Sequence, residues 1–242
     1  MRNELLLIIT LLIEYTGVVL AYKFFGRNGL YAWVGLATVL ANIEVMILVR
    51  AFGIEMTLGN VLFATTFLVT DILSENYGKK YAAKGVRVGI ASALFFMLVS
   101  FSWLMYIPSE NDVTSEAFRG LFAYTPRVII SSLVVFVIVQ HLDVWLYHKI
   151  WDITASKFGN KTKGLWIRNN VATMSSQLVN AVLYNIFAFG GIYPQKTIIQ
   201  IIVSTLIIYF ITSLADTPFL YWARKIKYKK DSLSRQTVGK SN

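Results

Sequence analysis

The sequence contains no cysteine and few charged residues. The absence of cysteine excludes disulfides and thiolate metal sites. The chain also lacks the residue patterns that mark a zinc protease, a nucleophile elbow or a phosphate-binding loop. We therefore predict that the protein is not an enzyme and has neither a metal site nor a cofactor. Charged residues make up 15% of the chain and apolar residues 56%, which is typical of a membrane protein.

Long apolar runs are found where a soluble domain would have mixed sequence. Segments of about 20 mostly apolar residues recur, and each can cross the roughly 30 Å hydrocarbon layer of a bilayer. We predict an all-α membrane protein with seven spans. The predicted spans are residues 5–22, 30–49, 57–77, 86–107, 128–147, 170–192 and 197–222. Between the fourth and fifth spans, residues 117–122 have an amphipathic pattern, which predicts a segment that lies on the membrane or covers an outer cavity.

The basic residues lie unevenly on the two sides of these spans. Eighteen of the 23 lysines and arginines fall on the side that holds the C-terminus, and none lies deeper in a predicted span than Arg87, the second residue of the fourth. Because cytoplasmic loops carry the excess of positive charge, the C-terminus is predicted to be cytoplasmic and the N-terminus to be outside. The net charge of +10 is then a topology signal, so no nucleic-acid partner is expected. Residues 226–242 are predicted to form a basic, disordered cytoplasmic tail.

Apart from Arg87 at the very start of the fourth span, the charged side chains within the spans are all acidic. A carboxylate in the membrane interior is costly unless it faces a cavity or a partner. Since no lysine or arginine is predicted beside them, we expect their partners to be neutral donors, protons, metal ions or a cationic or donor-rich ligand. The six acidic residues are Glu14, Glu44, Asp71, Glu75, Asp143 and Asp216.

The segment that ends the third span concentrates this acidity. Asp71 and Glu75 lie four residues apart, so they share one face of a helix, which Gly78 is predicted to end. The pair predicts either a site that faces the protein interior or a helix end in the wet interface, and the residues alone leave both open. Asp71 and Asp216 both fall roughly 10 Å from the cytoplasmic boundary, which favours a shared site.

The sixth span carries a polar stripe at helical spacing. Its members are Thr173, Gln177, Asn180 and Tyr184, and Gln177 falls in the same layer as the two aspartates. Amides and phenols offer donors and acceptors without charge. Two interpretations stay open here: a ligand site, or hydrogen bonds that only hold helices together.

Several motifs occur in an order that resembles the vitamin-uptake family of queuosine-precursor transporters. They are Asn42, residues 67–78 with Thr70-Asp71, Glu75 and Tyr77-Gly78, then Asp143-Val144, residues 176–180 and residues 216–219. The resemblance implies a six-helix transmembrane core over residues 29–225, similar to the substrate-binding components of energy-coupling-factor vitamin importers. Residues 1–28 would be an extra N-terminal transmembrane helix and loop. Asn180 departs from the family pattern, because many members have Asp at this position.

The same resemblance implies a function. It predicts import of 7-deazaguanine bases (7-cyano- or 7-aminomethyl-7-deazaguanine, or queuine) across a bacterial cell membrane for tRNA modification. A carboxylate would accept the paired donors of a guanine-like edge, amides would read the other edges, and an aromatic ring would stack on the base. The predicted substrate contacts are Asn42, Asp71, Glu75, Trp103, Gln177, Asn180, Tyr184 and Asp216.

Other functions remain open at this stage. The same fold would serve a transporter of another vitamin or of a purine, and a non-transporting membrane scaffold would use the polar stripes only to join helices. The predicted partners are the base and the lipid bilayer. A homo-oligomer and an ATPase coupling module are neither supported nor excluded by the sequence.

Overall fold

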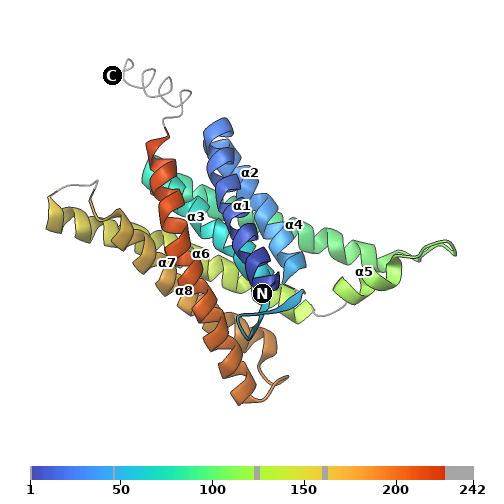
Figure 1. Ribbon diagram of the computed structural model, residues 1–242. Helices are drawn as coiled ribbons and strands as arrows, with labels where there is room; N and C mark the ends of the chain where they lie inside the picture. The colour runs from blue at the N-terminus through green and yellow to red at the C-terminus, as the bar shows by residue number, and fades with distance from the viewer. Residues whose placement is uncertain (1, 46, 123–125, 160–162, 227–242) are drawn as a thin grey trace.

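The structure of the protein is a computed structural model that describes residues 2–45, 47–122, 126–159 and 163–226. Helices dominate these residues, as the predicted class requires (Figure 1). The helices are α1 (Arg2–Phe25), α2 (Arg27–Glu44), α3 (Gly59–Tyr77), α4 (Lys79–Met105), α5 (Ser115–Phe122), α6 (Pro126–Phe158), α7 (Leu165–Phe189) and α8 (Gln195–Lys225). Residues 227–242 of the predicted tail lie outside the described residues.

Helix α3 is the most deeply buried helix of the bundle. Its residues from Val61 to Ser74 are buried, with Phe63 half-buried. The helix can start against α2 because Gly59 has no side chain there: a β-carbon would lie 2.7 Å from the backbone oxygen of Ala41. Gly78 ends α3 with a φ of 92°, a conformation that favours glycine, so the predicted stop is confirmed. The acidic segment of α3 therefore lies inside the protein.

A short β-hairpin between α2 and α3 is the exception to the all-α prediction. Strands β1 (Leu48–Ala51) and β2 (Ile54–Thr57) pair antiparallel through a turn at Phe52 and Gly53, whose φ angles are 51° and 75°. Positive φ at both positions is what a two-residue type I′ turn requires. The hairpin is held to the start of α1, since the Asn3 side-chain amide donates to the Arg50 carbonyl oxygen at 2.9 Å. Strands of four residues carry too little periodicity to be recognised in an apolar sequence.

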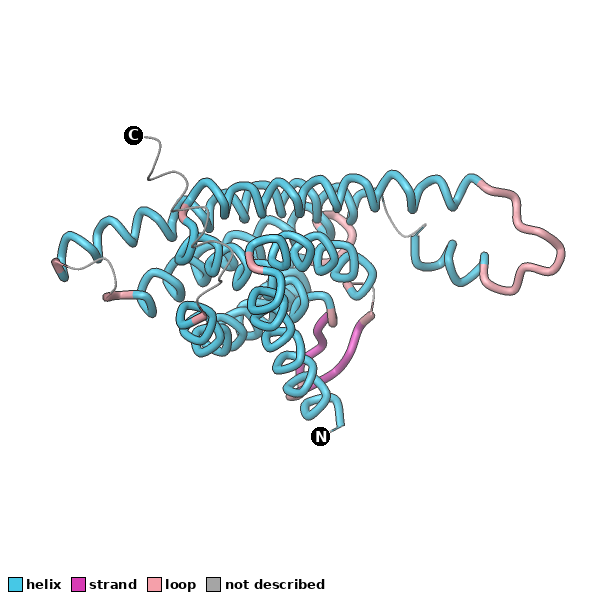
Figure 2. The backbone as a smooth tube through the Cα atoms, turned by 90° about the horizontal axis from the view of Figure 1, so that it is seen from above, coloured by secondary structure: helices cyan, strands magenta, loops and turns pink. Residues whose placement is uncertain are grey.

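Four helices, α1, α4, α6 and α8, are long and apolar enough to cross a membrane. Helices α2, α3 and α7 have 18, 19 and 25 residues. Helix α3 is buried over most of its length, whereas α7 buries polar residues on one face and exposes apolar residues such as Leu178 on the other. The views in Figures 1 and 2 show the helices gathered into one bundle, with α4 and α6 extending beyond it on opposite sides.

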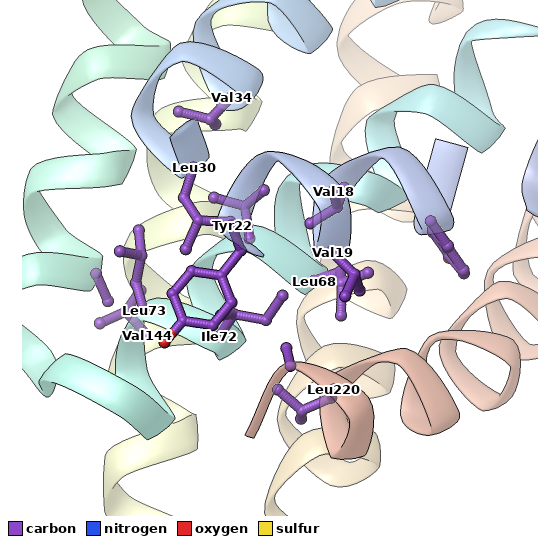
Figure 3. Close-up of a cluster of buried hydrophobic side chains, with 14 of the residues drawn as sticks. Val18, Val19, Tyr22, Leu30, Val34, Leu68, Ile72, Leu73, Val144 and Leu220 are labelled. Atoms are coloured by element: carbon purple, nitrogen blue, oxygen red, sulfur yellow. The ribbon is translucent and has the colours of Figure 1, made fainter. Parts of the chain in front are cut away.

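Helix α1 is joined to the bundle by a buried apolar cluster (Figure 3). The cluster draws on α1, α2, α3, α4, α6, α7 and α8, and its labelled members are Val18, Val19, Tyr22, Leu30, Val34, Leu68, Ile72, Leu73, Val144 and Leu220. A hydrogen bond adds to this contact, because the buried Tyr15 hydroxyl donates to the Thr212 carbonyl oxygen at 3.1 Å. The extra N-terminal helix is thus packed as an integral part of the molecule.

The segments with most of the positive charge meet at one end of the bundle. The Arg27 guanidinium lies 5.1 Å from the centre of the Tyr81 ring, which joins the α1–α2 turn to the start of α4. Arg224, near the end of α8, lies 3.3 Å from a carboxylate oxygen of Glu75. The basic segments that the sequence predicts to share one side of the membrane thus meet in the fold. That this side is cytoplasmic stays a prediction.

Several helices are longer than their predicted spans. Helix α4 begins at Lys79 instead of residue 86, α6 continues to Phe158 instead of ending at 147, and α7 begins at Leu165 instead of 170. Basic residues were taken to mark loops, but on a helix they can lie over aromatic rings: the Lys84 ammonium is 5.2 Å from the Tyr31 ring centre. Because α7 begins five residues before the predicted span, Arg168 lies within this helix and not in a loop.

The amphipathic segment before α6 forms helix α5, as its pattern indicated. Asp112 caps this helix by accepting hydrogen bonds from the Thr114 and Ser115 backbone amides at 2.7 and 2.9 Å. The Ser115 hydroxyl also donates to Asp112, and these bonds lower the pKa of its carboxyl to about 2. Figure 2 shows α5 at the far end of α4, away from the bundle, so it does not cover the middle of the molecule.

Candidate functional site

A cavity lies between the helices toward the hairpin end of the bundle. The space that it leaves for water-sized molecules is about 60 Å³. Six helices contribute to it: α2, α3, α4, α6, α7 and α8. Its polar lining is Thr38, Asn42, Asn60, Ser132, Asn180, Tyr184 and Tyr209, and its aromatic lining is completed by Phe63, Phe96 and Phe136. Among the residues that the structure describes, no charged side chain lines it.

The amides and phenols of the lining form a network. The Tyr209 hydroxyl accepts a hydrogen bond from the Asn180 side-chain amide at 2.9 Å and donates one to the Asn60 side-chain oxygen Oδ1 at 3.3 Å. Across the cavity, the Asn42 side-chain oxygen accepts from the Ser132 hydroxyl at 3.4 Å. Because a side-chain amide has two donors and an acceptor oxygen, these bonds leave capacity for a ligand.

Three buried aspartates lie deeper in the bundle than the cavity. Asp71 of α3 and Asp143 of α6 are fully buried, and Asp216 of α8 is 1% exposed. They are close enough to act on one another electrostatically. Each follows a cavity residue on its own helix by seven or eight residues, which is two turns, or roughly 11 Å. We call these three residues the acidic layer.

The acidic layer has few hydrogen-bond donors. The Thr173 hydroxyl donates to Asp71 Oδ2 at 3.2 Å, and the Asn169 amide donates to Asp216 Oδ1 at 2.8 Å. Asp71 Oδ1 and both oxygens of Asp143 have no hydrogen-bond partner among the residues that the structure describes. The hydroxyls nearest to Asp143 belong to Thr70 and Ser176, and both donate to carbonyl oxygens of their own helices.

The polar stripe of α7 connects the cavity to this layer. Asn180 lines the cavity, Gln177 is one turn deeper, and Thr173 bonds to Asp71 another turn on. Gln177 is 1% exposed, and neither atom of its amide has a partner in the described part of the chain. We call Asn180, Gln177, Thr173 and Asp71 the polar column. The stripe therefore faces inward, and the helix-joining interpretation does not account for Gln177.

Glu75 has a different environment, and here the expectation of neutral partners is wrong. The Arg168 guanidinium donates to both carboxylate oxygens of Glu75, at 2.7 and 2.6 Å from Nη2 and 3.0 Å from Nε. Arg168 is fully buried, lies 4.3 Å from the Trp151 ring centre and donates its remaining Nη1 to the Lys163 carbonyl oxygen. The pair was missed because the sixth span was predicted to start at residue 170, which placed Arg168 in a loop.

The predicted site residues thus divide into groups. Asn42, Asn180 and Tyr184 line the cavity. Asp71, Gln177 and Asp216 lie together below it, and Glu75 belongs to the ion pair with Arg168. Trp103 is not brought to the site: its ring packs against Phe118 of α5, although it also contacts Phe96, which lines the cavity.

Comparison with known proteins identifies the family. Residues 57–223 match the model of the family described as "putative vitamin uptake transporter", so the match runs from the end of the hairpin almost to the end of α8. The chain belongs to this family. It is also 38% identical over 226 residues to a Bacillus subtilis (strain 168) protein named "Probable queuosine precursor transporter", an alignment that covers 93% of this chain and 96% of the relative. No solved structure matches the chain.

The structure adds cavity residues that the sequence analysis of this transporter did not select. Asn60 and Tyr209 come from the start of α3 and the middle of α8, and they meet Asn180 in one network. Single polar residues in apolar segments give no spacing signal, and nothing in the chain order shows that these three meet. Asp143 was recorded as an acidic residue of the fifth span, but only the fold shows that it lies beside Asp71.

Proposed function

We propose that this transporter imports a 7-deazaguanine base and binds it in the six-helix cavity. The observation that carries the proposal is the cavity lining, in which neutral amides and phenols alternate with aromatic rings. The relative from Bacillus subtilis, named as a queuosine precursor transporter, gives the class of substrate. Use of the imported base in tRNA modification belongs to the same proposal.

The lining suits a flat, neutral heterocycle. Asn42, Asn60 and Asn180 offer donors and acceptors from three different helices, as the edges of a guanine-like base require. Phe63 and Tyr184 supply rings on which such a base can stack, and stacking of this kind contributes about 1–3 kcal/mol per base. A scaffold protein that only joins helices has no need of this open, polar space.

The absence of charge in the lining favours one substrate over another. A 7-aminomethyl group is cationic at neutral pH, and burial of an ammonium group without a partner is costly. The 7-cyano group is neutral and needs only a donor or a dipole. We therefore expect the transporter to bind 7-cyano-7-deazaguanine more tightly than the aminomethyl compound. Asn180 matters here, since an Asp at this position, expected in many relatives, would supply the missing charge.

The arrangement in the membrane follows from the same proposal. Six helices, α2, α3, α4, α6, α7 and α8, form the transport core around the cavity, and α1 is an addition to it. The cavity lies toward the hairpin end of the bundle, away from the basic segments, and so in the outer half of a bacterial cell membrane in the predicted orientation. A base would enter from outside, and the C-terminus would be cytoplasmic.

A thermal-shift panel on the purified transporter tests the proposal. The panel includes 7-cyano- and 7-aminomethyl-7-deazaguanine, queuine, guanine and unrelated vitamins. A ligand at a hundredfold excess over its dissociation constant stabilises the folded state by about 2.7 kcal/mol, which is well resolved in such an assay. We expect a rise in melting temperature with deazaguanines alone. Stabilisation by a vitamin or by no compound at all would contradict the proposal.

A further inference from the structure

The acidic layer holds three carboxylates in a place where charge is hard to sustain. Asp71, Asp143 and Asp216 are at most 1% exposed. Within the described residues, none of them pairs with a lysine or arginine, and the Arg168 guanidinium is already bonded to Glu75. Ionised carboxylates buried without cationic partners cost several kcal/mol each. At least some of these groups must therefore carry a proton.

A second observation is an unpaired amide that lies between the layer and the cavity. Gln177 lies between Asn180, which lines the cavity, and Thr173, which bonds to Asp71. Its buried amide has an unpaired donor and an unpaired acceptor, although buried polar groups are nearly always paired. A side chain of this kind can bridge the cavity and the Asp71 carboxylate, directly or through a water molecule.

The geometry selects a proton over a metal ion. The described residues include no group of three or more His, Cys, Asp or Glu side chains placed to hold a metal ion. A proton needs only one carboxylate oxygen with a free lone pair, and Asp71 Oδ1 provides it. A sodium ion would need several oxygen ligands that converge on one point.

The three carboxylates are not equivalent. Asp143 accepts no hydrogen bond within the described residues, although the Thr70 and Ser176 hydroxyls lie near it. Asp216 receives a hydrogen bond from Asn169 at 2.8 Å, which supports its ionised form. Asp71 is intermediate, since Thr173 donates to one oxygen and the other is unpaired. It is also the carboxylate at the end of the polar column, so it alone has a polar connection to the cavity.

We propose that Asp71 is a proton-binding site that couples import of the base to inward movement of protons. The inference rests on the proposed function, because it concerns the same cavity. The Glu75–Arg168 pair and Arg224 lie beyond Asp71, toward the basic end of the bundle. Asp71 takes a proton from the cavity side through the polar column and releases it once the other side opens. The titratable groups that face Asp71 are Asp143, Asp216, Glu75 and Tyr147.

Uptake into proteoliposomes tests the coupling, with the membrane potential clamped. One proton per base allows up to about tenfold accumulation for each pH unit of an inward proton gradient. We expect the wild-type transporter to accumulate labelled 7-cyano-7-deazaguanine under this gradient but not under a sodium gradient of the same size. A pH dye in the lumen should show acidification when the base is added outside at equal pH. Accumulation that is indifferent to the proton gradient, or a silent dye during uptake, overturns the proposal.

Two matched variants test whether Asp71, and not Asp143, is the proton-binding residue. Asp71→Asn should lose accumulation but keep exchange of labelled for unlabelled base, which needs no proton movement. Asp143→Asn, at the same depth, mimics a carboxyl that is always neutral and should keep both. Accumulation by Asp71→Asn, or its loss in Asp143→Asn, overturns the assignment to Asp71. If the wild-type protein neither binds nor exchanges any deazaguanine, the proposed function itself fails, which is a different result from exchange without coupling.

Discussion

Asp71 and Glu75 lie one turn apart on α3, yet their surroundings differ. Glu75 receives hydrogen bonds from a buried guanidinium on both oxygens and has Arg224 at 3.3 Å. Asp71 has one hydroxyl donor and an unpaired oxygen. The first carboxylate belongs to a fully paired cluster, and the second to a polar column with hydrogen-bonding capacity to spare. A carboxylate whose hydrogen bonds are all made is typical of a structural role. A buried carboxylate with an unpaired oxygen is typical of a functional site.

Removal of the Glu75 charge should have the largest effect on stability. Glu75→Gln leaves the buried Arg168 without its ionic partner, and loss of one member of a buried ion pair costs about 3–5 kcal/mol. We expect a large fall in the melting temperature in detergent. Asp71→Asn is the matched control one turn away, and its stability should hold or rise, because it removes an unpaired carboxylate. Equal losses in both variants would contradict the distinction.

Charge placed in the cavity should change which ligand binds. In Asn180→Asp, an ionised carboxylate would accept a hydrogen bond from the ammonium of the aminomethyl base, an interaction of about 1.5–3 kcal/mol. The ratio of the two dissociation constants should then shift toward 7-aminomethyl-7-deazaguanine by roughly tenfold or more. Titration calorimetry with both bases measures it. An unchanged ratio would mean that position 180 does not face the substituent.

Truncation of Asn180 tests whether its side chain contacts the ligand or only joins helices. Asn180→Ala should weaken binding of the base by about 1–3 kcal/mol if its amide contacts the ligand. Stability should fall only slightly, since an interhelical hydrogen bond in a membrane averages about 0.6 kcal/mol. Leu178→Ala is the control, because Leu178 is 49% exposed on the outer face of α7. A comparable loss of affinity in Leu178→Ala with the protein folded would show that the wrong face was assigned.

The smallest effect on stability is expected at Gln177. Its amide has no partner to lose in the described structure, so Gln177→Leu should leave the melting temperature unchanged or slightly higher. Uptake should nevertheless slow, because the polar column is interrupted between Asn180 and Thr173. Gln177→Glu, which restores a polar group, serves as the comparison. A marked loss of stability in Gln177→Leu would return this residue to the helix-joining interpretation.

The sequence allowed much of the fold to be predicted, because membrane helices leave a strong apolar signal. The inward direction of the α7 stripe and the helix stop at Gly78 followed from periodicity and from the backbone freedom of glycine. Arg168 was misplaced because a basic residue at the end of an apolar run was taken as part of a loop. Its burial depends on Glu75 and Trp151, which are distant in the chain.

The site was harder to predict than the helices. Residues that share a helix face, such as Gln177 and Asn180, could be grouped from spacing alone. The meeting of Asn60, Asn180 and Tyr209 depends on how three helices pack, which spacing does not determine. Depth along each helix placed Asp71 and Asp216 in one layer, but it could not show that the cavity lies two turns away from them.

The absence of cysteine provides the most direct test of the cavity. Ser132→Cys changes one atom in the lining, and Ser131→Cys makes the same change at a buried neighbour that does not line it. We predict that a membrane-impermeant maleimide added outside intact cells labels Ser132→Cys, that 7-cyano-7-deazaguanine protects it, and that Ser131→Cys stays unlabelled. Labelling of Ser132→Cys that the base does not slow, or labelling from the cytoplasmic side alone, would contradict an outward-facing cavity that binds the base.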